Sequence, residues 1–142
     1  MKQEFQIKTE LKAMDIKLIH YFLSKESYWA KDIPLKLVET SLKNSYCIGV
    51  FHHNKQVAFS RLITDQATFA YLADVFVIVN YRKQGISKMM LDHLMQLPWV
   101  KSLRRIVLVT ADAHTLYIRY GFEPLRDTTR YMEIHTPERY KK

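Results

Sequence analysis

The sequence contains one cysteine, Cys47, among 142 residues. A single cysteine cannot form a disulfide within the chain, and its place in the apolar run 46–50 favours a buried packing residue over a nucleophile. No apolar run is long enough to span a membrane, and residues 1–8 lack the apolar region of a signal peptide. We therefore expect a cytoplasmic protein with no membrane partner.

Acidic residues are scarce relative to basic ones, which gives a formal net charge of +8 at pH 7. A nucleic acid, an anionic membrane surface or a phosphorylated cofactor would each suit this charge. The basic residues are scattered, and no nucleic-acid-binding motif is present. We therefore interpret the charge mostly as a solvated surface, with a bias toward a polyanionic cofactor. No nucleic acid partner is expected, and a nucleic-acid binder is the alternative.

Intrinsic disorder is excluded by a hydrophobic content of 48% with 13% aromatic residues. The length is that of one folded unit with a real core, and no linker, repeat or low-complexity segment interrupts it. We expect a single domain over residues 1–142. The adjacent His52 and His53 would point to opposite faces of a strand, so no metal site is expected from them.

Hydrophobic periodicity predicts an α+β layout. Strands are expected at 3–9, 45–51, 56–64, 68–79, 105–110 and 131–134, and helices at 16–23, 35–42, 86–97 and 113–120. The middle strands form an antiparallel meander, and the strand–helix–strand unit after them is a right-handed crossover, which makes one pair parallel. The expected sheet is therefore mixed, mostly antiparallel and flanked by helices.

The junction between strand and helix at residues 74–97 favours an anion. The first amides of a helix lack intrahelical acceptors, and the helix dipole places partial positive charge there. Gly85 would allow a phosphate to approach the backbone closely, and Arg82, Lys83 and Lys88 add full charges. The junction is either a diphosphate site or an ordinary turn with a solvated basic face.

Gly85 is the only glycine of this junction, which excludes both the Walker phosphate loop and the dinucleotide-binding fingerprint. The segment Val77–Ser87 resembles the coenzyme A loop of the GCN5-related N-acetyltransferases (GNAT). That loop reads Arg/Gln-x-x-Gly-x-Gly/Ala after a strand ending in Val-x-x-x-x-Arg. Ser87 replaces the last small residue of the pattern.

A second segment, Leu116–Phe122, is similar to another GNAT pattern, Leu-Tyr-x-x-x-Gly-Phe. The two motifs follow in the family's order with one predicted strand between them, so the resemblance covers roughly residues 45–134. It implies a single-domain GNAT-like fold and acetyl-coenzyme A as cosubstrate. It also implies that an amine of a small molecule attacks the acetyl group directly.

The resemblance further implies the site residues. Cofactor contacts are expected from Phe76, Val77, Val79, Arg82, Lys83, Gln84, Gly85, Ile86, Ser87, Lys88 and Thr110. Backbone amides around Phe76 and Val77 would stabilise the developing oxyanion. Thr110 stands where many members carry an asparagine. Tyr117 would donate a proton to the departing thiolate, or else serve only in packing, which is the role expected of Tyr120.

The general base is hard to assign, because no glutamate occurs between Glu39 and Glu123. Asp74 is the catalytic candidate and Asp65 a second one, although both positions also suit surface or turn carboxylates. Tyr28 and Trp29, in the connection 24–30, either cover the core or line a substrate pocket. A non-catalytic acyl-coenzyme A-binding or protein-interaction module remains the alternative function, and either a monomer or a homodimer is expected.

Overall fold

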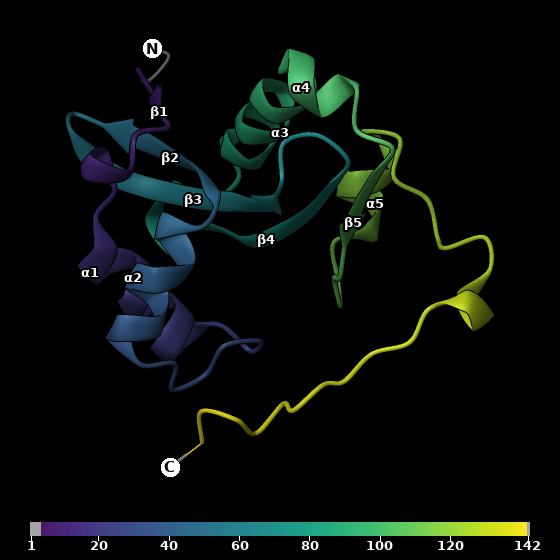
Figure 1. Ribbon diagram of the computed structural model, residues 1–142. Coiled ribbons are helices and arrows are strands. Elements are labelled where there is room, and N and C mark those ends of the chain that lie inside the picture. The colour runs from purple at the N-terminus through teal and green to yellow at the C-terminus, as the bar shows by residue number, and fades with distance from the viewer. Residues whose placement is uncertain (1–3, 142) are drawn as a thin grey trace.

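The computed structural model describes residues 4–141 (Figure 1). One five-stranded sheet has the strand order β1-β2-β3-β4-β5. Its strands are β1 (Gln6–Lys8), β2 (Tyr46–His52), β3 (Lys55–Thr64), β4 (Phe69–Val77) and β5 (Arg105–Leu108). β1 to β4 pair antiparallel, and β4 pairs with β5 in parallel. The predicted α+β class and the mixed sheet with one parallel pair are confirmed.

Nine helical segments connect and cover the described strands. They are η1 (Leu11–Ala13), α1 (Ile16–Tyr21), η2 (Phe22–Glu26), α2 (Leu35–Lys43), η3 (Val79–Tyr81), α3 (Ile86–Gln96), α4 (Pro98–Lys101), α5 (His114–Ile118) and η4 (Thr128–Arg130). The Asp15 carboxylate accepts the Leu18 N–H at 3.1 Å and so caps α1. Within residues 4–141, no helix has the length and apolarity needed to cross a bilayer.

The sheet separates two hydrophobic cores. α3 covers one face, where Met90 and Leu94 are buried, and α1 and α2 cover the other, where Phe22 stacks on Phe76 with ring centroids 4.0 Å apart (Figure 1). Cys47 lies in the second core and is 3% exposed, and this burial raises the pKa of its thiol to about 11. The prediction of a buried packing cysteine is confirmed.

The predicted strand at 131–134 is wrong. Met132 and Ile134 are 97% and 101% exposed. Residues 131–134 form no strand and pair with none of the five strands of the sheet. Their alternation with polar residues is typical of a strand, but the chain leaves the sheet after α5 and passes away from β5 (Figure 1). A strand pattern without a neighbouring strand yields only extended chain.

Other boundaries differ by a few residues. β5 ends at Leu108, two residues before the predicted end, and residue 3 of the predicted first strand lies outside the described part. His53 and Asn54 adopt positive φ in the turn after β2, so the His52 and His53 rings lie 4.1 Å apart instead of on opposite faces. Within residues 4–141 no three potential metal-ligating side chains are clustered.

Candidate active site

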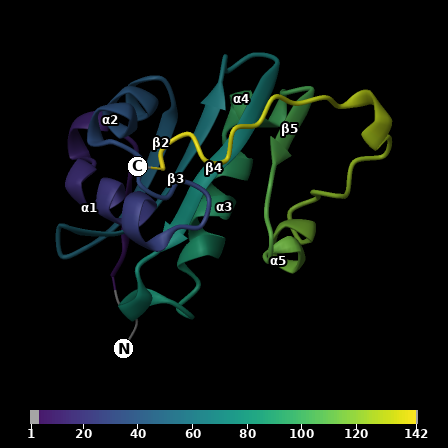
Figure 2. The same ribbon diagram turned by 90° about the horizontal axis from the view of Figure 1, so that it is seen from below.

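A bulge in β4 begins the site. Arg61 pairs with Ala73 and Phe59 with Phe76, so one residue of β3 faces two of β4, and Asp74 takes the left-handed conformation at φ 56°. The parallel pairing with β5 covers only Phe69–Leu72 of β4. Bulges bend a strand and strengthen its twist. Beyond the bulge the two strands diverge toward their C-terminal ends (Figure 2).

This divergence leaves backbone groups of β4 facing an open side. The Ile78 N–H donates to the Val57 carbonyl of β3 at 2.9 Å, and successive amides of an extended strand point to opposite sides. The N–H and C=O of Val77 therefore point away from β3. A hydrogen bond from Arg82 is consistent with this orientation of Val77, because Arg82 Nε donates to the Val77 carbonyl at 3.0 Å. The same alternation turns the Phe76 amide toward β3.

The loop after β4 ends at a helix N-terminus without a side-chain cap. Lys83 and Gly85 both have positive φ, 63° and 78°, and Gly85 is the N-cap of α3. A Cβ added at Gly85 would meet no protein atom within 4 Å. The N-terminus of α3 therefore has no side-chain cap, and the space beside Gly85 is open. A helix N-terminus with these two features fits a diphosphate.

The side chains expected at this loop fall into two groups. Phe76 and Ile86 are 4% and 2% exposed and pack in the two cores, so only their backbone can face a ligand. The exposed group is Val79, Arg82, Lys83, Gln84 and Lys88, with Ser87 half-buried. Lys88 forms a salt bridge with Asp92, in which Nζ lies 2.9 Å from Oδ2.

Tyr117 lies on α5 beside the open end of β5. Its side chain is 8% exposed, its ring contacts Phe122 edge-on at 5.8 Å, and burial raises the pKa of its phenol, with Tyr28 and Asp112 adding to the shift. The Thr110 hydroxyl oxygen accepts the Ala113 N–H at 3.0 Å at the start of α5. Thr110 therefore holds the helix that carries Tyr117.

Tyr120 binds a different partner. Its hydroxyl donates to Asp92 of α3 at 2.7 Å, and burial together with this carboxylate raises the pKa of the phenol to about 12. The contact joins the end of α5 to α3, which is a packing role. Asp65 lies in the turn between β3 and β4, where hydrogen bonds from Thr68 and Ala67 hold the pKa of its carboxyl well below the usual range. It caps its own turn.

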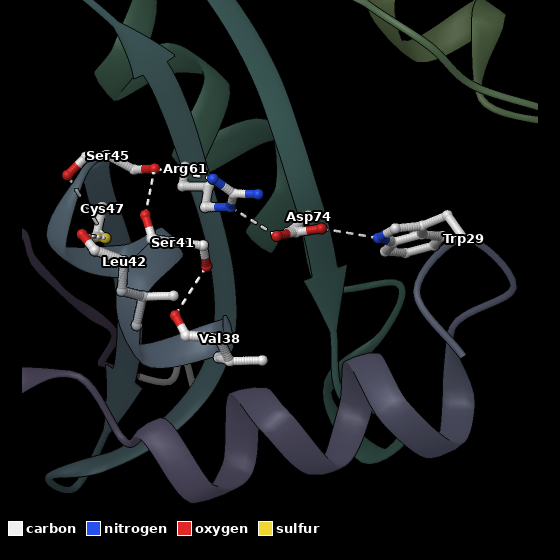
Figure 3. Close-up of polar contacts among 8 residues, drawn as sticks. All are labelled: Trp29, Val38, Ser41, Leu42, Ser45, Cys47, Arg61 and Asp74. Atoms are coloured by element: carbon white, nitrogen blue, oxygen red, sulfur yellow. Dashed lines mark hydrogen bonds and ion pairs between the residues drawn. The ribbon is translucent and has the colours of Figure 1, made fainter. Parts of the chain in front are cut away.

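Asp74 has partners for both carboxylate oxygens (Figure 3). Oδ2 accepts from Arg61 Nε at 2.6 Å, and Oδ1 accepts from Trp29 Nε1 at 2.8 Å. Arg61 also donates to Ser45 Oγ at 2.9 Å. Tyr28, next to Trp29, accepts the Ala111 N–H at 3.1 Å. The two aromatic residues therefore span from β4 to the end of β5, and they remain 63% and 42% exposed.

Sequence reasoning missed Arg61 and the bridging role of Tyr28. Arg61 is the only charged residue within the predicted strand 56–64, and a lone charge in an apolar strand is a signal that a buried counter-charge faces it. The Tyr28 contact joins residues 83 positions apart. No local pattern indicates a contact at that distance.

Comparison with known proteins agrees with this geometry. Residues 43–124 match the family described as the acetyltransferase (GNAT) domain. The chain belongs to the GNAT acetyltransferase family. A solved structure from Xanthomonas campestris pv. campestris, assigned to the same family, is 45% identical to this GNAT protein, with a TM-score of 0.97 and 100% of both chains covered.

Two further relatives are more distant. A Gibberella zeae protein classed as an acetyltransferase is 27% identical over 134 residues, which covers 80% of this GNAT protein and 76% of the relative. A Clostridium acetobutylicum acetyltransferase solved with acetyl-CoA is 16% identical, with a TM-score of 0.69 over 93% of this chain and 96% of that one. At that identity the likeness concerns the fold alone.

Proposed function

We propose that this GNAT protein transfers the acetyl group of acetyl-CoA to an amine of a small molecule. One observation carries the proposal: β4 separates from β5 beyond Leu72 and leads, through η3 and the loop 82–85, to the N-terminus of α3, which has no side-chain cap. Open strand amides at one end and an anion site at the other suit an elongated thioester that ends in a diphosphate. The net charge of +8 favours the same polyanion.

The loop 82–88 would hold the diphosphate. Amides of Ile86, Ser87 and Lys88 supply hydrogen bonds, and the open space beside Gly85 admits the phosphate groups. Arg82 uses Nε on the Val77 carbonyl, which leaves its terminal nitrogens free to bind oxygen atoms. Lys83 and Gln84 are exposed next to it and complete the polar rim.

The open backbone of β4 would polarise the acetyl carbonyl. Acetyl-CoA, when bound, supplies an activated acetyl thioester. The Val77 N–H points to the open side and can donate to an oxygen on which negative charge develops. We assign this donation to Val77, because the Phe76 amide turns toward β3.

Tyr117 would stabilise the sulfur as it departs. Burial raises the pKa of its phenol above the ordinary tyrosine value of about 10, so the phenol is protonated at neutral pH. Thiols of the cysteine type have a pKa of about 8.5, so complete proton transfer from Tyr117 to a thiolate is uphill. The contribution of Tyr117 is therefore a strong hydrogen bond from Oη, with solvent completing protonation.

The acceptor amine would bind on the side of Tyr28, Trp29 and Asp74. Aromatic faces near a carboxylate suit a cationic amine. Because Arg61 and Trp29 occupy both oxygens of Asp74, we assign Asp74 a positioning role that holds the aromatic loop over the diverging strands, with water accepting the amine proton.

The test is a thiol-release assay with acetyl-CoA and a panel of polyamines, arylamines, amino sugars and amino acid amides, alongside calorimetry with coenzyme A. The proposal predicts coenzyme A binding and amine-dependent thiol release. Binding without release for every amine class would favour a non-catalytic acyl-CoA-binding module. Absence of coenzyme A binding would overturn the proposal.

A further inference from the structure

The chain between β4 and α3 is held by few hydrogen bonds. The last bond from this part of the chain to β3 joins the Ile78 N–H to the Val57 carbonyl at 2.9 Å, and residues 79–85 then run outside the sheet. Within them, the amides of Tyr81 and Arg82 donate to carbonyls only three residues earlier. Such local bonds close a turn, but they do not fix its place relative to the sheet.

One long-range hydrogen bond fixes this turn to the sheet. Tyr81 Oη lies 2.8 Å from Nδ1 of His52, which is the last residue of β2 and precedes Tyr81 by 29 positions. When the imidazole is neutral with its proton on Nε2, the Tyr81 hydroxyl donates to Nδ1. Among residues 4–141, no other hydrogen bond joins residues 79–84 to a segment outside the stretch from β4 to α3.

Aromatic rings surround this hydrogen bond. The Phe5 ring contacts the Tyr81 ring edge-on at 6.2 Å and lies 5.5 Å from the His52 ring. The rings of His52 and Tyr81 meet edge-on at 5.4 Å, and both residues are half-buried. Figure 2 shows the start of the described chain beside the turn between β4 and α3. A hydrogen bond in such surroundings is stronger than one in open water.

The residues that follow Tyr81 are those that we assign to the diphosphate. Arg82 is next in sequence and bonds through Nε to the Val77 carbonyl, so its place depends on β4 and on the turn that ends at Tyr81. Lys83 has φ 63°, a conformation unfavourable for lysine that neighbouring contacts must hold. A shift of the turn would therefore move both cations relative to the N-terminus of α3.

We propose that the pair His52–Tyr81 positions the loop 82–88, so that Arg82 and Lys83 are in place for the diphosphate before it binds. This role rests on the function proposed above. We place neither side chain of the pair against the ligand, so both are positioning residues. A preformed site lowers the conformational cost of binding, and loss of the pair should therefore weaken binding more than chemistry.

Calorimetry with coenzyme A tests the pair. Tyr81→Phe keeps the ring and removes the hydroxyl, and His52→Leu removes the acceptor. Each should weaken coenzyme A binding about three- to tenfold, the range of one net hydrogen bond. The double variant should bind no more weakly than His52→Leu alone, because both substitutions remove the same bond. His52→Asn keeps an acceptor close to the place of Nδ1 and should recover most of the affinity.

Two matched controls lie on the same sheet. Tyr46→Phe removes another hydroxyl beside a histidine, since Tyr46 Oη lies 3.4 Å from His93 Nε2, but at the opposite end of β2. His53→Asn removes the neighbouring imidazole at φ 50°, a conformation that asparagine tolerates. Both variants should keep wild-type coenzyme A affinity. In turnover with acetyl-CoA, Tyr81→Phe should raise KM for acetyl-CoA and leave kcat nearly unchanged.

Hydrogen exchange without ligand gives a second measurement. Amides of residues 82–85 should exchange faster in Tyr81→Phe than in the wild type and in Tyr46→Phe. Wild-type affinity in Tyr81→Phe and His52→Leu, when the wild type binds coenzyme A, overturns this proposal alone. Losses that add in the double variant, or an equal loss in Tyr46→Phe, also overturn it. A wild type that does not bind coenzyme A overturns the proposed function and this proposal with it.

Discussion

The ion pair between Arg61 and Asp74 gives a prediction whose size follows from the structure. In the wild type, Arg61 Nε lies 2.6 Å from Asp74 Oδ2. Asp74→Asn retains a carbonyl that can accept from Trp29 but removes the negative charge opposite Arg61. The two side chains are 14% and 8% exposed. Breaking a buried pair costs about 3–5 kcal/mol. Arg61 keeps Ser45 as a partner and some solvent, so we expect about 3 kcal/mol.

The backbone does not confound this substitution. Asp74 has φ 56°, and asparagine is, after glycine, the residue that best tolerates the left-handed region. Urea denaturation gives the free energy of unfolding of Asp74→Asn, Arg61→Met and the double variant. The double variant should lose less than the sum of the single losses, by about 2 kcal/mol. A loss near 0.5 kcal/mol for Asp74→Asn, typical of an exposed pair, would refute the buried-pair reasoning.

Measurement of kcat distinguishes a positioning role of Asp74 from a role as proton acceptor. If Asp74 holds the aromatic loop, Trp29→Phe, which keeps an aromatic ring but removes the other hydrogen bond to the carboxylate, should lower kcat as Asp74→Asn does. Coenzyme A affinity should change little in either variant. Wild-type kcat in Trp29→Phe together with a large loss in Asp74→Asn would identify Asp74 as the proton acceptor.

Three further predictions concern the loop, α5 and the core. Gly85→Ala and Gly121→Ala both place a Cβ in open space at positive φ, 78° and 92°. Each substitution should cost about 1 kcal/mol of stability. Only Gly85→Ala should weaken coenzyme A binding, as measured by calorimetry. Tyr117→Phe removes one hydrogen-bond donor to the departing sulfur and should lower kcat roughly ten- to a thousandfold with coenzyme A affinity nearly unchanged. Tyr120→Phe should leave kcat near wild type. With its pKa raised to about 11, Cys47 is only about one thousandth ionised at pH 8, so a thiol reagent should label it only after unfolding; fast labelling of native protein would contradict its burial.

Local sequence patterns were sufficient for much of the fold. Strong β-branched and apolar alternation predicts β2, β3 and β4, and the apolar stripe of α3 predicts that helix to within one residue. The left-handed Gly121 after α5 follows from its motif and is confirmed at φ 92°. These features depend on neighbours in sequence, which a single chain displays directly.

Features that depend on distant residues were not predictable. The bulge at Asp74 arises from pairing with β3, and nothing in residues 68–79 alone requires it. The partner of Asp74 is Arg61, on the neighbouring strand, and the Trp29 bond comes from 45 residues away. The failed strand at 131–134 is the converse case, since its pattern is present and its pairing partner is absent within residues 4–141.

The central claim is that acetyl-CoA lies between the diverging ends of β4 and β5 with its diphosphate at α3. A crystal structure with acetyl-CoA tests it most directly. We expect the diphosphate at the amides of residues 86–88 and the acetyl oxygen within hydrogen-bond distance of the Val77 N–H. Density for the ligand along the outer edge of β5, with the loop 82–88 empty, would contradict the account.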